Sequence, residues 1–557
     1  MFHVKHIAKN KKMNNTDTTI VKGNLVDIIN REIYGAVVTI SNGKISKIER
    51  TGTVESDYIL PGFIDAHVHI ESSMCTPLHF GAAACKHGTI GIVADPHEIA
   101  NVLGVEGIDF MVNNAKEAPF YYWIGVPSCV PATPFESAGA IIDAATTEQL
   151  LKREDLHFLA EMMNYPGVLN KDPEVIGKLN AAKRANKPVD GHFPTGNGKA
   201  LEDYIANGIS TDHECATLEE GRDRCRNGMF VQIREGSAAK NFNALHPLLK
   251  EFPGKVMFCS DDIHPNTLME RHINGLVKRA VALGYDVFDV LRAASYNQAK
   301  HYSIPAGFLQ VGDNADFIIT EDLYSFTVKS TFVKGVCIYD GSNVSFPAKE
   351  TSRPNRFAID PITVSDLGIK AISDKMRVIV CSDGNLDTFE EIMEPTTNEG
   401  YAVSDTTKDV IKMVVLNRYQ KAAPAIGFIK GTGIKRGAMA QSITHDSHNI
   451  IAIGTTDREL ADAINEVILN KGGISVVNGD EKETLSLPVA GLISPLPLDQ
   501  IDIQYKKLES KMAELETTLS SLQMTLSFMS LLVIPAIKLG DKGLFDGKNF
   551  RFTNLFV

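Results

Sequence analysis

Apolar and polar residues follow two different patterns along this chain. Between residues 20 and 49 they alternate, and Asn-Gly and Gly turn signals separate the alternating runs, which predicts short antiparallel strands. From about residue 58 the pattern changes to short apolar runs that stop at polar residues, with helical stretches such as residues 173–187 between them. Strands that alternate with helices indicate a parallel sheet.

Eight apolar runs between residues 58 and 303 qualify as strands, and nearly every one ends in His, Asp, Glu or Arg. They are YILPGFIDAHVH, TIGIVADPHE, YYWIGVPSCV, LHFLAEMMN, PVDGHFP, GISTDHE, MFVQIREGS and KVMFCSDDIHP. A (β/α)₈ barrel takes about 250 residues and carries its chemistry at the C-terminal ends of its strands. We therefore predict an α/β protein with a TIM-like (β/α)₈ barrel over residues 58–303.

Further regions flank the predicted barrel. Residues 18–57 and 304–364 both read as alternating strands, so we expect them to form one small β-sandwich module that the barrel interrupts. Residues 365–557 mix strands with helices and should form a separate C-terminal α+β domain. Residues 1–17 are basic and polar without an apolar stretch, and we expect them to be a flexible leader.

The composition of the chain limits the kinds of molecule that it is expected to bind. The net charge of -12 argues against a sequence-independent grip on nucleic acid or on an acidic membrane surface. The late apolar run at residues 528–537 is far shorter than the ~20 residues of a spanning helix, and we expect it to be a core strand. The eight cysteines never form a C-x-x-C motif, which fits reduced thiols in the cytoplasm. A small-molecule substrate is the expected partner.

The polar residues at the strand ends suggest a shared site. His67 and His69 have one residue between them, so both rings project from the same face of a strand. The complete set of candidate ligands is His67, His69, Glu161, His192, His213 and Asp261. Imidazoles and carboxylates together at one barrel mouth predict a transition-metal site, and the set is large enough for two ions that share a carboxylate and a hydroxide.

Each of these histidines, taken alone, is more often a satisfied core residue than a ligand. Their joint position changes that balance, because unrelated core histidines have no reason to fall at the same end of three strands. His97 is open to two interpretations, since it could orient the hydroxide of the site or cap a helix. The remaining barrel histidines that we interpret as structural are His79, His87, His157, His246 and His272.

These motifs carry a family resemblance. PGFIDAHVHIESS resembles the opening signature of the amidohydrolase superfamily, and ESSM after the paired histidines is similar to the form in bacterial adenine deaminases. The similarity continues through ADPHEIANVLG, AEMMNYPGV, DGHFP, DHE, REGSAAKN and CSDDIHP, and through SITHDSHNIIAIGT and LSLPVAGLIS beyond the barrel. It covers about residues 18–557.

The resemblance implies hydrolytic deamination of adenine to hypoxanthine and ammonia, a step of purine salvage. It also implies two divalent metal ions, manganese first with iron or zinc as alternatives, held by the six candidate ligands with Glu161 as the bridge. A homodimer is expected. Some relatives in the superfamily bridge their metals with a carboxylated lysine from strand four, but no lysine ends that strand here.

The expected mechanism is attack of a metal-activated hydroxide on C6 of the purine. Asp261 would take the proton and pass it to the departing amino group. Asp262 would face a ring nitrogen, hold a ligand histidine, or form a turn, whereas Arg234 and Glu235 would hold the substrate or each other. The polar segment THDSHN at residues 444–449 would close over the barrel mouth or form a simple turn.

Two other functions stay open from the sequence. One is an amidohydrolase that acts on a different purine or on a cyclic amide, and the other is a metal-binding scaffold without catalysis. The scaffold would not need Asp261 as a general base. The zinc deaminases of the H-x-E and P-C-x-x-C type are excluded, because the chain has no P-C-x-x-C motif.

Overall fold

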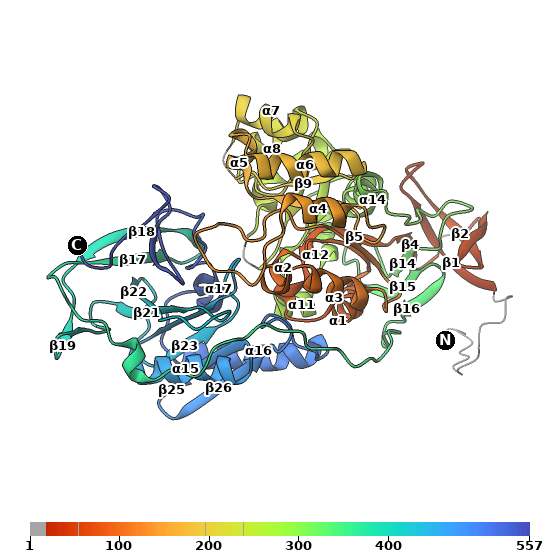
Figure 1. The fold of residues 1–557 in the computed structure, drawn as a ribbon. Helices are drawn as coiled ribbons and strands as arrows, with labels where there is room; N and C mark the ends of the chain where they lie inside the picture. Colours follow the sequence, from red (N-terminus) through yellow and green to blue (C-terminus); the bar gives the residue numbers. More distant parts are fainter. Residues whose placement is uncertain (1–17, 54, 195, 238) are drawn as a thin grey trace.

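The computed structural model describes residues 18–557 except positions 54, 195 and 238. The predicted leader at residues 1–17 therefore lies outside the described residues. A small sheet, a central barrel and a C-terminal domain lie side by side across the molecule, with the barrel between the other two (Figure 1). Among the described residues, no helix is both long and apolar enough to cross a membrane.

The central part is a closed barrel of parallel strands, as predicted. Each strand pairs in parallel with the next, through ladders or single bridges, and the last strand returns to pair with the first. The strands are β5 (Phe63–His69), β6 (Thr89–Ala94), β7 (Tyr121–Ile124), β8 (Leu159–Met162), β9 (Val189–Gly191), β10 (Thr211–Asp212), β11 (Phe230–Arg234), β12 (Val256–Cys259) and its continuation β13 (Asp261–Asp262). Strands such as β6 are buried on both faces, which explains why they read as continuous apolar runs.

Helices connect the barrel strands and cover the outside of the barrel. They are α1 (Pro77–Ala84), α2 (His97–Leu103), α3 (Val105–Ala115), α4 (Ala144–Leu151), α5 (Tyr165–Leu169), α6 (Pro173–Ala185), α7 (Lys199–Ala206), α8 (Leu218–Arg226), α9 (Phe242–Leu245), α10 (Leu248–Glu251), α11 (Pro265–Glu270), α12 (Ile273–Ala282), α13 (Val287–Leu291) and α14 (Asn297–Tyr302). Several begin with a side-chain cap, such as Asp172 on α6 and the Thr217 and Glu220 capping box on α8.

The small module is a seven-stranded sheet built from both sides of the barrel sequence. Its strands are β1 (Thr18–Asp27), β2 (Glu32–Ser41), β3 (Lys44–Arg50), β4 (Tyr58–Pro61), β14 (Phe317–Thr320), β15 (Val328–Val333) and β16 (Val336–Tyr339). The antiparallel pairing of β4 with β14 joins the two halves. The single strand predicted over residues 58–69 is therefore wrong, because β4 belongs to this sheet and only β5 enters the barrel.

The C-terminal domain is built on an eight-stranded sheet with helices packed against it. Its elements are β17 (Met376–Ser382), β18 (Asn385–Met393), β19 (Thr397–Asn398), β20 (Tyr401–Ala402), β21 (Val410–Leu416), β22 (Ala425–Lys430), β23 (Ala438–Gln441), β24 (Ile450–Gly454), α15 (Asp457–Leu469), β25 (Gly473–Asn478), β26 (Glu481–Ser486), α16 (Leu498–Ala513), α17 (Leu522–Ser527), β27 (Ile537–Gly540), β28 (Gly543–Asp546) and β29 (Arg551–Phe552). The core strand expected at residues 528–537 is wrong, since residues 528–536 are turns and β27 begins at Ile537. Leu531 and Leu532 are buried there without joining a ladder, and Pro535 has no N–H to offer one.

The barrel and the C-terminal domain share one apolar core. The helix α16 lies against α11 of the barrel (Figure 1), where the Tyr505 hydroxyl is 3.1 Å from His264 Nδ1 and Asn266 donates to Glu509 at 3.2 Å. The backbone N–H of Ser494 also donates to the carbonyl of Met74 at 2.8 Å. The C-terminal domain is thus packed directly on the barrel.

A buried arginine fixes the loops that follow β9 and β10. Arg224 Nε donates to Asp212 Oδ2 at 2.9 Å, and both side chains are 0% exposed. Its other nitrogens donate to the carbonyls of Gly196 at 2.9 Å and Phe193 at 2.8 Å. Asp212 Oδ1 in turn accepts from the N–H of Phe193 at 3.0 Å. The network therefore ties the loop that follows β9 to the end of β10.

Replacing Arg224 by Met should lower the free energy of unfolding by about 3–5 kcal/mol, because it leaves the buried Asp212 carboxylate without its cation. The control is Arg222→Met, which breaks a pair with Glu251 whose side chains are 30% and 34% exposed, and should cost at most about 1 kcal/mol. Denaturant unfolding of both variants measures the difference. Equal losses would show that burial of the Arg224 pair carries no special weight.

Candidate metal centre

The six side chains predicted as ligands come together at the C-terminal ends of the barrel strands. Two end β5, one lies in β8, two follow β9 and β10, and one opens β13. They are His67, His69, Glu161, His192, His213 and Asp261, and all but the partly exposed His192 are buried. Within this set, the ligand atoms of His67, His213 and Asp261, and those of Glu161, His192 and His213, each lie within 4.8 Å of one another.

Glu161 stands at the middle of this group and divides it into two pairs. Its Oε1 lies 3.9 Å from His67 Nε2 and 3.3 Å from His69 Nε2. Its Oε2 lies 2.7 Å from His192 Nδ1 and 3.2 Å from His213 Nε2. Each carboxylate oxygen therefore faces one pair of imidazoles, which is the arrangement that a bridging ligand between two ions requires.

Asp261 faces the first pair from the neighbouring strand β13. Its Oδ1 is 3.6 Å from His67 Nε2 and 3.2 Å from His69 Nε2, while its Oδ2 accepts from Arg234 at 2.7 Å. The backbone of Asp261 is in the left-handed region with φ of 56°, a conformation that costs a residue with a side chain about 1–3 kcal/mol. Pairing of β13 with β5 holds it there, since Asp261 lies opposite Val68. Backbone strain thus sits at the residue that faces both an imidazole pair and a guanidinium.

The residues fit a bound cation. Both ring nitrogens of His67 and Nδ1 of His213 are buried and have no hydrogen-bond partner among the described residues, an arrangement that is unfavourable unless something else binds them. Burial would raise the pKa of Glu161, but the positive charge of His192 and hydrogen bonds from His192, His213 and His69 hold it well below the usual range. Burial would also raise the pKa of Asp261, but the positive charge of Arg234 and the imidazole hydrogen bonds together outweigh it and hold this pKa well below its usual range. The two carboxylates are therefore ionised and face imidazoles, which is the donor chemistry of borderline divalent metals.

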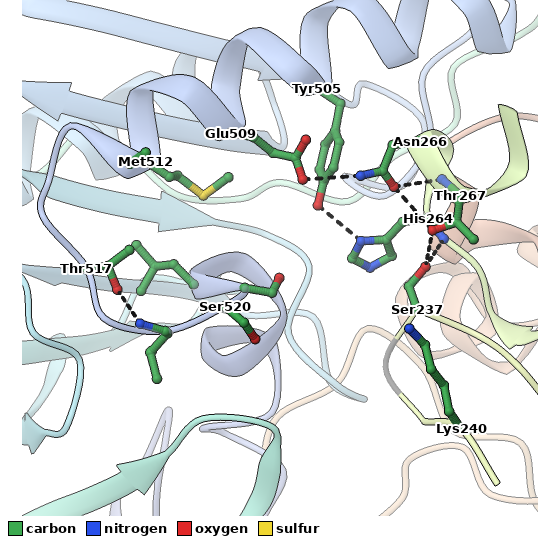
Figure 2. A pocket seen from close by; sticks show the side chains of 14 residues that line it. Ser237, Lys240, His264, Asn266, Thr267, Tyr505, Glu509, Met512, Thr517 and Ser520 are labelled. Atoms are coloured by element: carbon green, nitrogen blue, oxygen red, sulfur yellow. Dashed lines mark hydrogen bonds between the residues drawn. The ribbon is translucent and has the colours of Figure 1, made fainter. Parts of the chain in front are cut away.

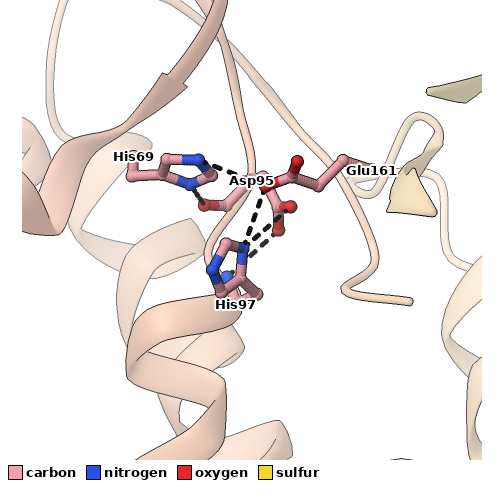
Figure 3. A group of neighbouring side chains, drawn as sticks. All are labelled: His69, Asp95, His97 and Glu161. Atoms are coloured by element: carbon pink, nitrogen blue, oxygen red, sulfur yellow. Dashed lines mark hydrogen bonds and ion pairs between the residues drawn. The ribbon is translucent and has the colours of Figure 1, made fainter. Parts of the chain in front are cut away.

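His97 lies beside the centre and is the first residue of α2. The capping role is wrong, because Pro96 and not His97 occupies the N-cap position of this helix. Figure 3 shows Asp95 between His69 and His97, with Glu161 approaching from the other side. His97 Nδ1 is 3.1 Å from Asp95 Oδ2 and 3.6 Å from Glu161 Oε1, and His69 Nδ1 is 3.1 Å from the Asp95 carbonyl. Asp95 was missed from the sequence, although it stands in the same ADPHE segment as His97. It fixes the rings of both histidines.

Arg234 and Glu235 do not hold each other, so that expectation is wrong. Arg234 Nη1 lies 2.5 Å from Glu214 Oε1 and 2.7 Å from Asp261 Oδ2, while Glu235 pairs with Arg279 at 2.5 Å on the outer side. The two side chains point to opposite faces of a strand end, as neighbours in a strand do. Glu214 was also missed, although it is the last residue of the DHE segment.

Asp262 sits next to the centre and is only partly buried. Its Oδ1 accepts a hydrogen bond from Ser72 at 2.5 Å, a residue of the ESSM segment. The ligand oxygen of Asp262 also lies within 4.8 Å of the ligand atoms of His69 and Asp261. The contact with Ser72 ties the ends of the first and last barrel strands together across the closure of the barrel.

The THDSHN segment is a buried loop between β23 and β24. Its histidines contact Glu98, the residue after His97, so the C-terminal domain reaches the barrel mouth. The segment forms a turn at residues 445–447 and also lies against the barrel mouth, so the two possibilities left by the sequence do not exclude each other. The loop belongs to the wall of the site.

A pocket of about 280 Å³ lies between the barrel and the C-terminal domain. It is lined by Ser237 and His264 of the barrel and by Tyr505 and Glu509 of α16 (Figure 2). The N–H of Ser237 donates to the carbonyl of Asp262 at 2.7 Å, so the pocket adjoins the end of the last barrel strand. The C-terminal domain therefore shapes the surroundings of the barrel mouth on this side as well.

Comparison with known proteins gives a consistent picture. The family described as "Amidohydrolase family" matches residues 58–338, and the one described as "Adenine deaminase C-terminal domain" matches residues 385–551. A protein of Parabacteroides distasonis named adenine deaminase is 59% identical over 545 residues, which are 98% of this chain and 100% of that protein. Proteins of the same name from Methanosarcina mazei and Salinibacter ruber are each 47% identical, over 96% of this chain and 99% of their own length.

Replacing His67 by Asn should lower the amount of bound divalent metal, because the variant keeps a neutral polar side chain but removes an imidazole nitrogen that faces both Glu161 and Asp261. The control is His157→Asn, since His157 stacks on Trp123 at 3.8 Å and touches none of the six side chains. Elemental analysis of both purified variants gives metal per chain. Full metal in His67→Asn would remove His67 from the centre.

Replacing Glu161 by Gln should cost at least one ion, because an amide offers one weak oxygen where the carboxylate faces two imidazole pairs. Metal analysis after dialysis against a weak chelator, with circular dichroism to check that the barrel is folded, measures the loss. Two ions retained per chain would make Glu161 a structural residue.

Proposed function

The chain belongs to the adenine deaminase family of amidohydrolases, and from this membership we propose that it hydrolyses adenine to hypoxanthine and ammonia. The similarity to proteins of that name covers both the barrel and the C-terminal domain, which supports the whole activity and not only a hydrolase fold. The observation that carries the proposal is the single carboxylate of Glu161 facing two imidazole pairs at the barrel mouth.

We propose two divalent ions, manganese in the first place and iron or zinc as alternatives. His67 and His69 would hold one ion and His192 and His213 the other, with Glu161 between them and Asp261 on the first. When bound, the ions would supply the Lewis acidity that makes a water molecule a nucleophile at neutral pH. The support is the division of the two Glu161 oxygens and the buried imidazole nitrogens that lack partners among the described residues.

Asp261 is the proposed proton carrier. A C–O bond forms at C6 and the C–N bond to the amino group breaks, so one proton of water must reach the departing nitrogen for ammonia to leave, and the other remains on the ring of hypoxanthine. Asp261 Oδ1 faces the imidazole pair, while Arg234 holds Oδ2 at 2.7 Å. Arg234 thereby fixes the carboxylate, and positioned acid–base groups of this kind contribute about 10²-fold to 10⁴-fold.

The other predicted site residues take supporting roles in the proposal. His97, held by Asp95 at 3.1 Å, would orient the attacking water beside Glu161. Asp262, partly exposed and held by Ser72, would contact the purine. Arg234 would reach the substrate through Nε, which has no partner among the described residues.

For the cell we propose purine salvage in the cytoplasm by a homodimer. Light scattering of the purified protein tests the dimer.

The reaction itself is tested by loading the protein with manganese and following ammonia release from adenine, adenosine and a cyclic ureide. Release from adenine alone supports the proposal, whereas release from the ureide would indicate an amidohydrolase for cyclic amides, and no release from any would leave a metal-binding scaffold.

Asp261→Asn should lower turnover of adenine at least ~10²-fold, because an amide cannot accept the proton. Asp262→Asn is the matched neighbour and should keep more turnover and lose mainly apparent affinity, since Asp262 is only partly buried and accepts a hydrogen bond from Ser72. Turnover, Michaelis constant and bound metal are measured for both. A greater loss of turnover in Asp262→Asn would reverse the two roles.

A further inference from the structure

The loop of residues 444–449 is anchored on a barrel carboxylate. Glu98 Oε1 is 2.6 Å from His445 Nδ1, and its Oε2 contacts His448 Nε2. The ring of His445 also stacks on Phe528 with centroids 4.4 Å apart, and the N–H of Thr444 donates to His448 Nδ1 at 3.3 Å. Both oxygens of Glu98 are therefore occupied by the C-terminal domain.

Glu98 links this loop to the metal centre through its neighbour. His97 Nε2 is 3.4 Å from Glu98 Oε1, and His97 Nδ1 is 3.6 Å from Glu161 Oε1. The loop, Glu98, His97 and Glu161 thus form a continuous buried row. A residue of the loop that faces His97 must lie next to the centre.

Asp446 is that residue. It stands between the two anchoring histidines in sequence, is 4% exposed, and its ligand atoms lie within 4.8 Å of those of His97 and Glu98. Its Oδ2 is buried and has no hydrogen-bond partner among the described residues. Burial and then the charge of Glu98 raise the pKa of Asp446 to about 6, so the ionised form dominates at neutral pH. Asp446 Oδ1 lies 3.9 Å from His445 Nδ1. An ionised carboxylate can only accept hydrogen bonds, and a buried oxygen such as Oδ2 that has no partner among the described residues is unfavourable until a donor arrives.

We propose that Asp446 is a substrate-contact residue whose carboxylate accepts a hydrogen bond from the exocyclic amino group of the purine. This assignment rests on the proposed function. The carbon that reacts must lie at the metal centre, and the amino group is attached to that carbon, so the group that receives its N–H must also adjoin the centre. Asp446 meets that condition through His97.

The contact would distinguish substrate from product. Adenine offers N–H donors at this position, whereas hypoxanthine carries an oxygen there and offers only an acceptor. A carboxylate facing that oxygen repels it, so Asp446 would favour adenine and assist the release of hypoxanthine. Sites built to hydrogen-bond one substrate group discriminate strongly against the analogue that lacks it.

The test compares Asp446→Asn with Asp502→Asn in the manganese-loaded full chain. Asp502 is a matched control, because it is also in the C-terminal domain, is 6% exposed and has an unpartnered Oδ1 among the described residues, but it lies on α16 and pairs with Lys506. The measurements are kcat/KM for adenine, the inhibition constant of hypoxanthine, and metal per chain. Asp446→Ala replaces the Asn variant if that variant does not fold.

We expect Asp446→Asn to lower kcat/KM for adenine roughly 10-fold to 100-fold, to leave or strengthen inhibition by hypoxanthine, and to keep the metal content of the wild type. Asp502→Asn should change none of these. Equal weakening of adenine and hypoxanthine, or no change for either, would overturn the assignment. A third ion in the wild type that Asp446→Asn loses would also overturn it, in favour of a cation site at His97, Glu98 and Asp446. A wild type that releases no ammonia from adenine would instead refute the proposed function itself, and this assignment with it.

Discussion

A carboxylate buried among four imidazoles is the constraint on which the rest of this structure depends. Glu161 has two oxygens, and each must meet its own pair of rings. Those rings come from three different strands, so the demand is met only if the sheet closes and brings strands distant in sequence to one rim. The barrel supplies that closure by pairing β13 with β5. The fold is thus the means by which one side chain reaches both pairs.

Three buried aspartates accept hydrogen bonds from the backbone that carries residues of this site. Asp65 Oδ1 accepts from the N–H of His67 at 3.1 Å, and Asp95 Oδ1 does the same for His97 at 3.0 Å. Asp212 Oδ1 accepts from Glu214 at 3.2 Å, one residue past His213. In each case a carboxylate ties down the backbone two residues ahead, inside β5 for Asp65 and at the end of a strand for Asp95 and Asp212. The rings above them are therefore carried by chain that has little freedom to move, which is what precise positioning of reactive groups requires.

The sequence predicted the barrel and the meeting of its six polar side chains because both follow from local patterns. An apolar run that ends in His or Asp marks one strand end, and parallel strands bring all such ends to one rim. Pro61 and Gly62 are a local sign of a break within residues 58–69, but no local pattern shows that the part before the break joins a different sheet. The contacts of Glu98 with His445 and His448 are beyond any local pattern, because they join residues 347 and 350 positions apart. What depends on packing between domains had to come from the structure.

The grip of His445 and His448 on Glu98 also bears on how this protein could be recombined. A chimera that takes its barrel from one relative and its C-terminal domain from another inherits the carboxylate from one parent and both imidazoles from the other. If either parent lacks its share, the hybrid buries an ion without a counterion at the rim of the centre, even though each half is well formed. The barrel and the C-terminal domain are therefore not interchangeable modules. A chimera should take residue 98 and residues 445–448 from the same parent protein.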